Sequence, residues 1–189
     1  AYEIADRDWS SDVCSSDLHD LTRTRVVGNL PYYITTPIII KLIESKAEFE
    51  SLTVMMQKEV GDRLLAEPGT KLAGAITYAV HYRCTVDKIC DVSREAFYPV
   101  PKVDSLVLRL DMRGEPAVDV ADEDRFFRCI KAGFSMRRKT LLNSLQAIDD
   151  VSREDIRMAL GRVNIDPSRR AETLTMEEFA ELSNSIWEE

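Results

Sequence analysis

Asn29, Leu30, Pro31 and Tyr32 form the stretch of sequence whose residue types are best suited to chemistry. They follow a short β-branched run, which predicts a strand over 26–29 that ends in a loop, the place where open α/β sheets bind ligands. The Asn29 side-chain oxygen and the Pro31 carbonyl would offer two acceptors, and Tyr32 a flat ring. This set suits a planar base with an exocyclic amine, because two acceptors can hold both N–H groups in the pyramidal geometry of a transition state. Alone, the motif is also compatible with an ordinary strand-to-helix turn.

The elements that must position this loop alternate in type and predict an α/β fold. A helix is expected to begin at Thr36 and Pro37, because proline is tolerated at the first helical position. The residues of 103–110 alternate, with Ser105 and Val107 on one face and Leu106 and Leu108 on the other. The expected strands are 26–29, 51–56, 85–92 and 103–110, of which the last two form an antiparallel edge pair, and the expected helices are 36–43, 58–65 and 73–82.

Beyond a Gly/Pro linker at 114–120, the pattern predicts only helices. Acidic residues 122–124 suit a helix N-terminus, and apolar residues follow at helical spacing. Ser152 with Asp155, and Thr175 with Glu178, predict capping boxes that open two further helices. The expected division is therefore 19–113 for the α/β part, 114–120 for the linker and 121–189 for a small all-helical domain.

Composition excludes several classes of protein. The chain has 189 residues, a formal charge of −8 and 44% hydrophobic residues, and no apolar run reaches the roughly 20 residues of a membrane span. The four cysteines and two histidines show no metal-ligand spacing, so neither a metal site nor a disulfide framework is expected. These features favour a cytoplasmic protein without a membrane partner.

Residues 1–18 differ in character from the rest. The string at 10–18 matches neither helical nor strand periodicity and is similar to one reading frame of a sequencing-library adapter, so we interpret 1–18 as a motif remnant followed by a scar. An ordinary Ser/Asp loop is the alternative.

Three further motifs accompany the first in a characteristic order: Met56-Gln57-Lys58-Glu59-Val60, the string from Phe97 to Ser105 (FYPVPKVDS) and the string from Phe134 to Asn143 (FSMRRKTLLN). Together with 27–34 they resemble the ribosomal RNA small-subunit adenine N6,N6-dimethyltransferases, over about residues 22–189. The resemblance implies a partial Rossmann-like class I methyltransferase sheet followed by a helical domain. It also implies S-adenosylmethionine as methyl donor and dimethylation at N6 of two adjacent adenines near the 3′ end of small-subunit (16S) rRNA.

The resemblance also assigns site residues. Asn29 and Pro31 would bind the target amine, Tyr32 would stack on the base, and Phe97 would close on its other face. By residue type alone, Phe97 is better interpreted as a core aromatic before a Pro-rich turn. The donor would be contacted by Asn29, Leu30, Glu3 and Asp20.

One departure from the family concerns the donor site. No G-x-G-x-G loop occurs in the chain, and the family's first strand and helix are not found. Because the strand ending at Asn29 is central in the family's sheet, an unpaired hydrophobic edge is expected. We therefore expect the chain as written to be poorly stable and weakly active or inactive.

A local basic segment offsets the acidic total. Residues 125–139 contain six Arg or Lys residues and no acid, so this segment can attract RNA although the whole chain is acidic. The alternative is a solvated helix face paired with the acidic C-terminal helix. The expected partner is small-subunit rRNA or the pre-ribosomal small subunit, bound by a monomer through Lys102, Arg128, Lys131, Arg137, Arg138 and Lys139.

Two rival functions are left open. The first is the antibiotic-resistance methylase of large-subunit RNA, which shares the Asn-Leu-Pro-Tyr loop. The second, from another class, is a non-catalytic rRNA-binding or ribosome assembly factor.

Overall fold

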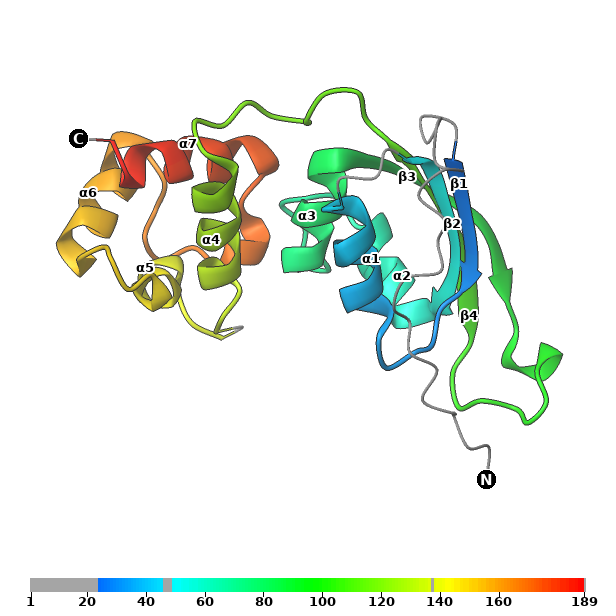
Figure 1. Ribbon diagram of the computed structural model, residues 1–189. Helices are drawn as coiled ribbons and strands as arrows, with labels where there is room; N and C mark the ends of the chain where they lie inside the picture. Colours follow the sequence, from blue (N-terminus) through cyan, green and yellow to red (C-terminus); the bar gives the residue numbers. More distant parts are fainter. Residues whose placement is uncertain (1–23, 46–48, 137, 189) are drawn as a thin grey trace.

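The protein is described by a computed structural model over residues 24–45, 49–136 and 138–188. Within these ranges, the strands form one mixed sheet in the order β1-β2-β4-β3 (Figure 1). β1 is parallel to β2, whereas β4 lies between β2 and β3 and is antiparallel to both, which confirms the expected antiparallel edge pair. The strands are β1 (Thr24–Asn29), β2 (Phe49–Gln57), β3 (Cys84–Val92) and β4 (Ser105–Met112).

Three helices cover one face of this sheet (Figure 1). The strand residues that face them are almost fully buried, because alternate side chains of a strand point to the same side. The helices are α1 (Thr35–Ile43), α2 (Lys58–Leu65) and α3 (Ala75–Arg83). The core between the two layers is built from Ile39, Ile43, Leu52, Val54, Met56, Leu64, Leu106, Leu108 and Leu110.

Helix α2 approaches β4 closely at a glycine. A Cβ atom on Gly61 would lie 2.2 Å from the Leu106 Cδ1 atom, which is too short for any real contact. The absence of a side chain at Gly61 therefore lets the helix rest directly on the leucine row of β4.

The second hydrophobic cluster lies among the helices that follow the extended segment after β4. Side-chain caps open three of them, since Asp122, Ser152 and Thr175 accept hydrogen bonds from the backbone N–H three residues later. The expected capping box is confirmed at Thr175, whereas Ser152 caps its helix without the reciprocal bond, because the Asp155 carboxylate accepts from the Ser152 hydroxyl. The helices are α4 (Glu123–Gly133), α5 (Leu141–Ser144), α6 (Arg153–Arg162) and α7 (Met176–Ile186).

Helix α3 belongs to both clusters. The Tyr78 hydroxyl donates to the Leu174 carbonyl oxygen (2.5 Å) and accepts from the Gly69 N–H (3.1 Å). The Tyr78 ring packs on Phe134 and Phe179, and burial raises the pKa of Tyr78 to about 12. The α/β part and the helical part therefore share core side chains.

Two expectations need correction. The first helix begins at Thr35, so Pro37 is its third residue; proline is tolerated there because no N–H of the first turn has an intrahelical partner. The last strand, expected from Val103, begins at Ser105, and Ser105 is fully buried although it lies on the face opposite the leucines. No helix among the described residues is long and apolar enough to cross a membrane.

Candidate functional site

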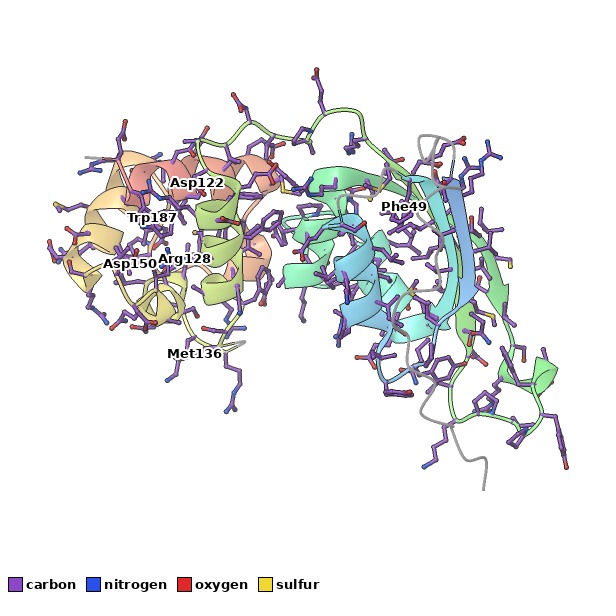
Figure 2. The ribbon with its side chains drawn as sticks, in the orientation of Figure 1. Phe49, Asp122, Arg128, Met136, Asp150 and Trp187 are labelled. Atoms are coloured by element: carbon purple, nitrogen blue, oxygen red, sulfur yellow. The ribbon has the colours of Figure 1, made fainter. Side chains whose placement is uncertain are left out.

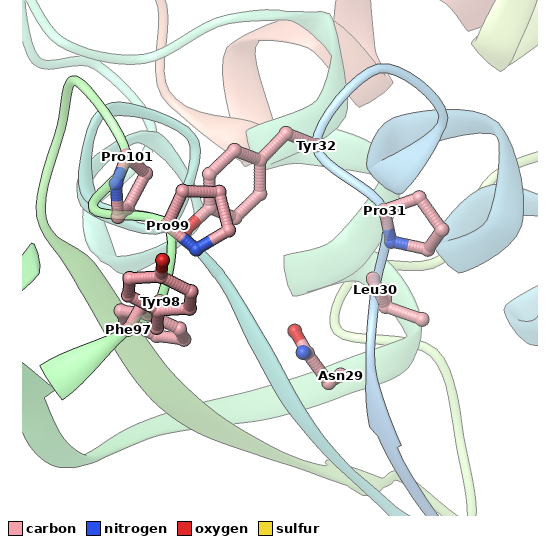
Figure 3. A pocket seen from close by; sticks show the side chains of 8 residues that line it. All are labelled: Asn29, Leu30, Pro31, Tyr32, Phe97, Tyr98, Pro99 and Pro101. Atoms are coloured by element: carbon pink, nitrogen blue, oxygen red, sulfur yellow. The ribbon is translucent and has the colours of Figure 1, made fainter. Parts of the chain in front are cut away.

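One pocket gathers the four residues that the sequence analysis singled out for the target base. Asn29, Pro31 and Tyr32 line it from the β1–α1 loop, and Phe97 lines it from the connection between β3 and β4. Its volume is about 320 Å³, at the lower end of the range of small-molecule sites. Figure 3 shows the Asn29 amide pointing into the space between these two segments. The remaining lining residues are Leu30, Tyr98, Pro99 and Pro101.

The β1–α1 loop is fixed by hydrogen bonds of its own backbone. The Leu30 N–H donates to the Met55 carbonyl oxygen (3.0 Å), which extends the β1–β2 ladder by one residue. The Pro31 carbonyl oxygen accepts two bonds, from the Ile34 N–H (3.1 Å) and from the buried Thr35 hydroxyl (3.0 Å). A carbonyl oxygen has two lone pairs, so the Pro31 carbonyl has little capacity left for a ligand.

The Leu30 carbonyl differs from that of Pro31. No hydrogen bond to the Leu30 oxygen is found among residues 24–45, 49–136 and 138–188. In this conformation, the backbone acceptor that is open beside Asn29 is therefore the Leu30 carbonyl. The sequence could not distinguish these two neighbouring carbonyls, because their use depends on where α1 begins.

The β3–β4 connection brings Phe97 to the pocket. It starts with a single 3₁₀ turn, η2 (Arg94–Ala96), which Ser93 caps by accepting from the Glu95 N–H. Asp104 then holds the two ends of the connection together, since its carboxylate accepts from the Arg94 N–H (3.0 Å). As a result, Phe97 is half-buried at the pocket, while Tyr98 on the rim is fully exposed.

The Tyr32 side chain is hydrogen-bonded to β4, the strand beyond β2 in the sheet. Its hydroxyl lies 2.6 Å from the Oγ atom of Ser105, the first residue of β4. The loop after β1 is thereby joined to β4 across the end of β2. Sequence reasoning missed Ser105 and Thr35 as contacts of this site, and no local pattern marks either residue.

The structure describes only part of the expected donor site. Asn29 and Leu30 lie in the pocket, whereas Glu3 and Asp20 are outside the described residues. No group of three or more His, Cys, Asp or Glu side chains that could hold a metal ion occurs among the residues that the structure describes.

The expected RNA-binding residues are spread over several surfaces. Arg138 lines a cavity of about 750 Å³ between the α/β part and the helical part. Two cations that the sequence analysis did not select, Arg63 and Lys71, line the same cavity. Lys102 lines a separate cavity of about 410 Å³ near the base pocket, and Arg137 is outside the described residues. The cavity residues Arg63, Lys71 and Arg138 come from three separate segments, so spacing alone could not connect them.

Arg128 already has partners in the structure. Its guanidinium forms an ion pair with Asp150 and lies 5.3 Å from the centre of the Trp187 ring (Figure 2). The Trp187 indole N–H donates to the same carboxylate (3.4 Å), and the hydrogen bond from Arg128 lowers the pKa of Asp150. Arg128, on α4, thus contacts Trp187 at the end of α7 and Asp150 in the connection before α6. Its neighbour Lys131 forms no ion pair within the described residues.

Comparison with known proteins gives a consistent result. The family model described as "Ribosomal RNA adenine dimethylase" matches residues 4–188. Similar curated proteins include two called "Ribosomal RNA small subunit methyltransferase A". That of Clostridium botulinum (strain Loch Maree) is 48% identical over 87% of this chain, and that of Geobacillus thermodenitrificans is 48% identical over 93%. The chain spans 59% and 64% of the lengths of these two relatives.

Solved structures share the fold. A dimethyladenosine transferase from Plasmodium falciparum superposes with a TM-score of 0.67 at 27% identity, over 84% of this chain and 64% of that one. The 23S rRNA methyltransferase ErmE superposes with a TM-score of 0.63 at 23% identity, over 88% of this chain and 66% of that one. The arrangement of the sheet and helices is therefore that of a methyltransferase fold.

Proposed function

The chain belongs to the ribosomal RNA adenine dimethylase family, and we propose on this basis that its pocket holds the target adenine during methylation of small-subunit rRNA. The reaction would transfer methyl groups from S-adenosylmethionine to N6 of two adjacent adenines near the 3′ end of that RNA. The observation that carries the proposal is the meeting of Asn29, Tyr32 and Phe97 in one pocket from two distant segments.

Two acceptors in the pocket suit the amine of adenine. We assign them to the Asn29 side-chain oxygen and the Leu30 carbonyl, because the Pro31 carbonyl already accepts two hydrogen bonds. Each acceptor would take one N–H of the amine and draw its nitrogen toward pyramidal geometry. The nitrogen lone pair would then attack the methyl carbon of the donor sulfonium, and sulfur would depart with the bonding electrons. The methylated nitrogen, now positively charged, would release one proton to solvent. Pro31 would contribute rigidity, since its ring fixes the backbone between Leu30 and Tyr32.

The aromatic residues suit the faces of the base. A base that has left its stack is held by flat side chains in many enzymes that modify nucleic acids. Tyr32 and Phe97 line the pocket from its two segments, so each would cover one face of the adenine ring. Fully exposed Tyr98 lies on the rim, where single-stranded RNA would enter.

The cavity between the two parts of the molecule suits the RNA backbone. Three cations, Arg63, Lys71 and Arg138, line it together with one carboxylate, that of Glu172, and Arg63 also forms an ion pair with Glu59. Tyr32 lines the base pocket, and Thr36, the second residue of α1, lines this cavity. The two sites therefore meet where the β1–α1 loop passes into α1. We propose that the RNA runs from the base pocket along this cavity to Arg138 and Lys139.

The experiment measures binding and transfer with the same pair of proteins. The chain and its Asn29→Ala variant are titrated with RNA from the 3′ end of the small-subunit rRNA and with the same RNA carrying purine, which lacks the amine, in place of the target adenines. The unchanged chain should prefer adenine, and Asn29→Ala should lose that preference. With S-adenosylmethionine present, mass spectrometry should find N6-dimethyladenine only with the unchanged chain. This transfer should be slow, because the chain has no G-x-G-x-G loop to bind the methyl donor.

The rival functions predict other results. A methylase of large-subunit RNA would methylate a large-subunit fragment in preference to the small-subunit one. An assembly factor would bind the small-subunit RNA equally well with adenine or purine and would form no methyladenine. Equal affinity for the two RNAs would therefore refute the proposed use of the pocket.

A further inference from the structure

Ser105 does not contact the base in the binding scheme above, but its side chain is hydrogen-bonded to Tyr32, which does. Its side chain is fully buried where β4 begins, beside Gln57 at the end of β2 and Val92 at the end of β3. Within the described residues, its one side-chain hydrogen bond is the 2.6 Å contact with the Tyr32 hydroxyl. A buried hydroxyl at the junction of three strands thus meets an aromatic side chain of the pocket.

The side chains of the loop that carries Tyr32 are largely exposed, although its backbone is hydrogen-bonded. Tyr33, the next residue, is 85% exposed, and Pro31 before it is also exposed. The Tyr32 ring is half-buried, so packing alone covers only part of it. The Tyr32 ring reaches from the loop toward the segment with Pro99 and Pro101 (Figure 3). The hydrogen bond to Ser105 holds the hydroxyl end of the ring at the start of β4, between two other strands of the sheet.

We propose that Ser105 is a positioning residue that fixes the plane of the Tyr32 ring before the base arrives. The inference rests on the proposed function, because it concerns the stacking of the target base on Tyr32. A ring that is already fixed loses little conformational entropy on binding, and this gain appears as affinity. Ser105 itself would not touch the RNA.

The proposal predicts how two substitutions behave together. Tyr32→Phe keeps the ring and removes the hydroxyl, whereas Ser105→Ala keeps the ring and its hydroxyl but removes the anchor. Each should weaken binding of the base about threefold to tenfold, the range of one net hydrogen bond. The double variant should bind no more weakly than either single variant, because both changes break the same bond.

The probe is a short single-stranded RNA in which formycin, a fluorescent isomer of adenosine that keeps the amine of the six-membered ring, replaces one of two adjacent adenosines. The fluorescence of formycin falls when its ring stacks on an aromatic side chain, so the signal reports stacking as well as affinity. Ser51→Ala is the matched control, because Ser51 is a serine of similar burial on β2 that pairs with Asp111 at the opposite end of the sheet. Thermal unfolding of every variant shows whether Ser105→Ala changes the fold as a whole.

The outcomes separate the two proposals. Quenching by the unchanged chain and the Ser51→Ala variant, with weaker quenching by Ser105→Ala and Tyr32→Phe alike, supports the positioning role. Undiminished quenching by Ser105→Ala, or additive losses in the double variant, overturns it and leaves the proposed function intact. If the unchanged chain does not quench the probe and also binds adenine and purine RNA equally, the proposed function fails and the positioning role with it. If Ser105→Ala unfolds, Tyr32→Phe decides the question, because its ring stays and the buried serine is unchanged.

Discussion

Substitution of Tyr78 by phenylalanine tests whether the α/β part and the helical part unfold as one unit. Tyr78 lies on α3, but its hydroxyl is bonded to the Leu174 carbonyl and the Gly69 N–H, and Leu174 belongs to the core of the helical part. Phenylalanine keeps the ring contacts with Phe134 and Phe179. The change therefore removes the hydrogen bond that crosses to the helical part, at Leu174, together with the bond to Gly69 within the α/β part.

The size of the effect follows from the environment of these bonds. Leu174 is fully buried, so water cannot replace the lost donor at its carbonyl. A buried group left without its partner costs about 1–3 kcal/mol, and we expect Tyr78→Phe to lower the free energy of unfolding by about 2 kcal/mol. For a chain of this length, that loss corresponds to a decrease in Tm of about 4–8 °C.

The assay is urea unfolding followed by circular dichroism and by tryptophan fluorescence. The chain has two tryptophans, so the assay uses a Trp9→Phe background in which Trp187 alone reports the helical part. Circular dichroism reports both parts, so coincident transitions indicate a single unit. Tyr33→Phe is the control, because that side chain is 85% exposed. A loss below about 0.5 kcal/mol, or two separate transitions in the unchanged chain, would contradict a core shared through α3.

Particular side chains predict three further outcomes. Gly61→Ala should lower stability by about 1–3 kcal/mol in the same urea assay, since the added Cβ collides with Leu106; a neutral effect would show that α2 can shift on the sheet. Glu178→Gln should lower the Tm at pH 6. Because the hydrogen bond from Arg169 lowers the pKa of Glu178, this contribution is full above the ordinary pKa of glutamate and is lost as the pH falls through the lowered value. A Tm difference that stays constant down to pH 2 would exclude it. Combined Lys71→Ala and Arg138→Ala should weaken RNA binding and reduce its salt dependence. The slope of log K against log salt should fall by about 0.7 for each phosphate that is no longer neutralised. The control Lys88→Ala, on β3, should change neither quantity.

The sequence by itself determined the local features of this protein. Proline cannot extend a strand ladder, so Pro31 marks the end of β1 and the start of the loop that forms the pocket. The leucines of 106–110 show which face of β4 is buried, because side chains of a strand alternate. Ser152 and Thr175 show where two helices begin, since a helix N-terminus needs side-chain acceptors within one turn. All of these depend on residues a few positions apart.

The tertiary structure alone decided which distant residues meet and which candidate groups are already in use. Phe97 faces Asn29, and Ser105 holds Tyr32, only because β4 inserts between β2 and β3. The sequence selected Arg128 as an RNA contact but could not show that its guanidinium pairs with Asp150, 22 residues along the chain. The Pro31 carbonyl is filled because α1 begins early enough for Thr35 to reach it. Such outcomes depend on strand order and on the exact starts of helices, and residue spacing along the chain encodes neither.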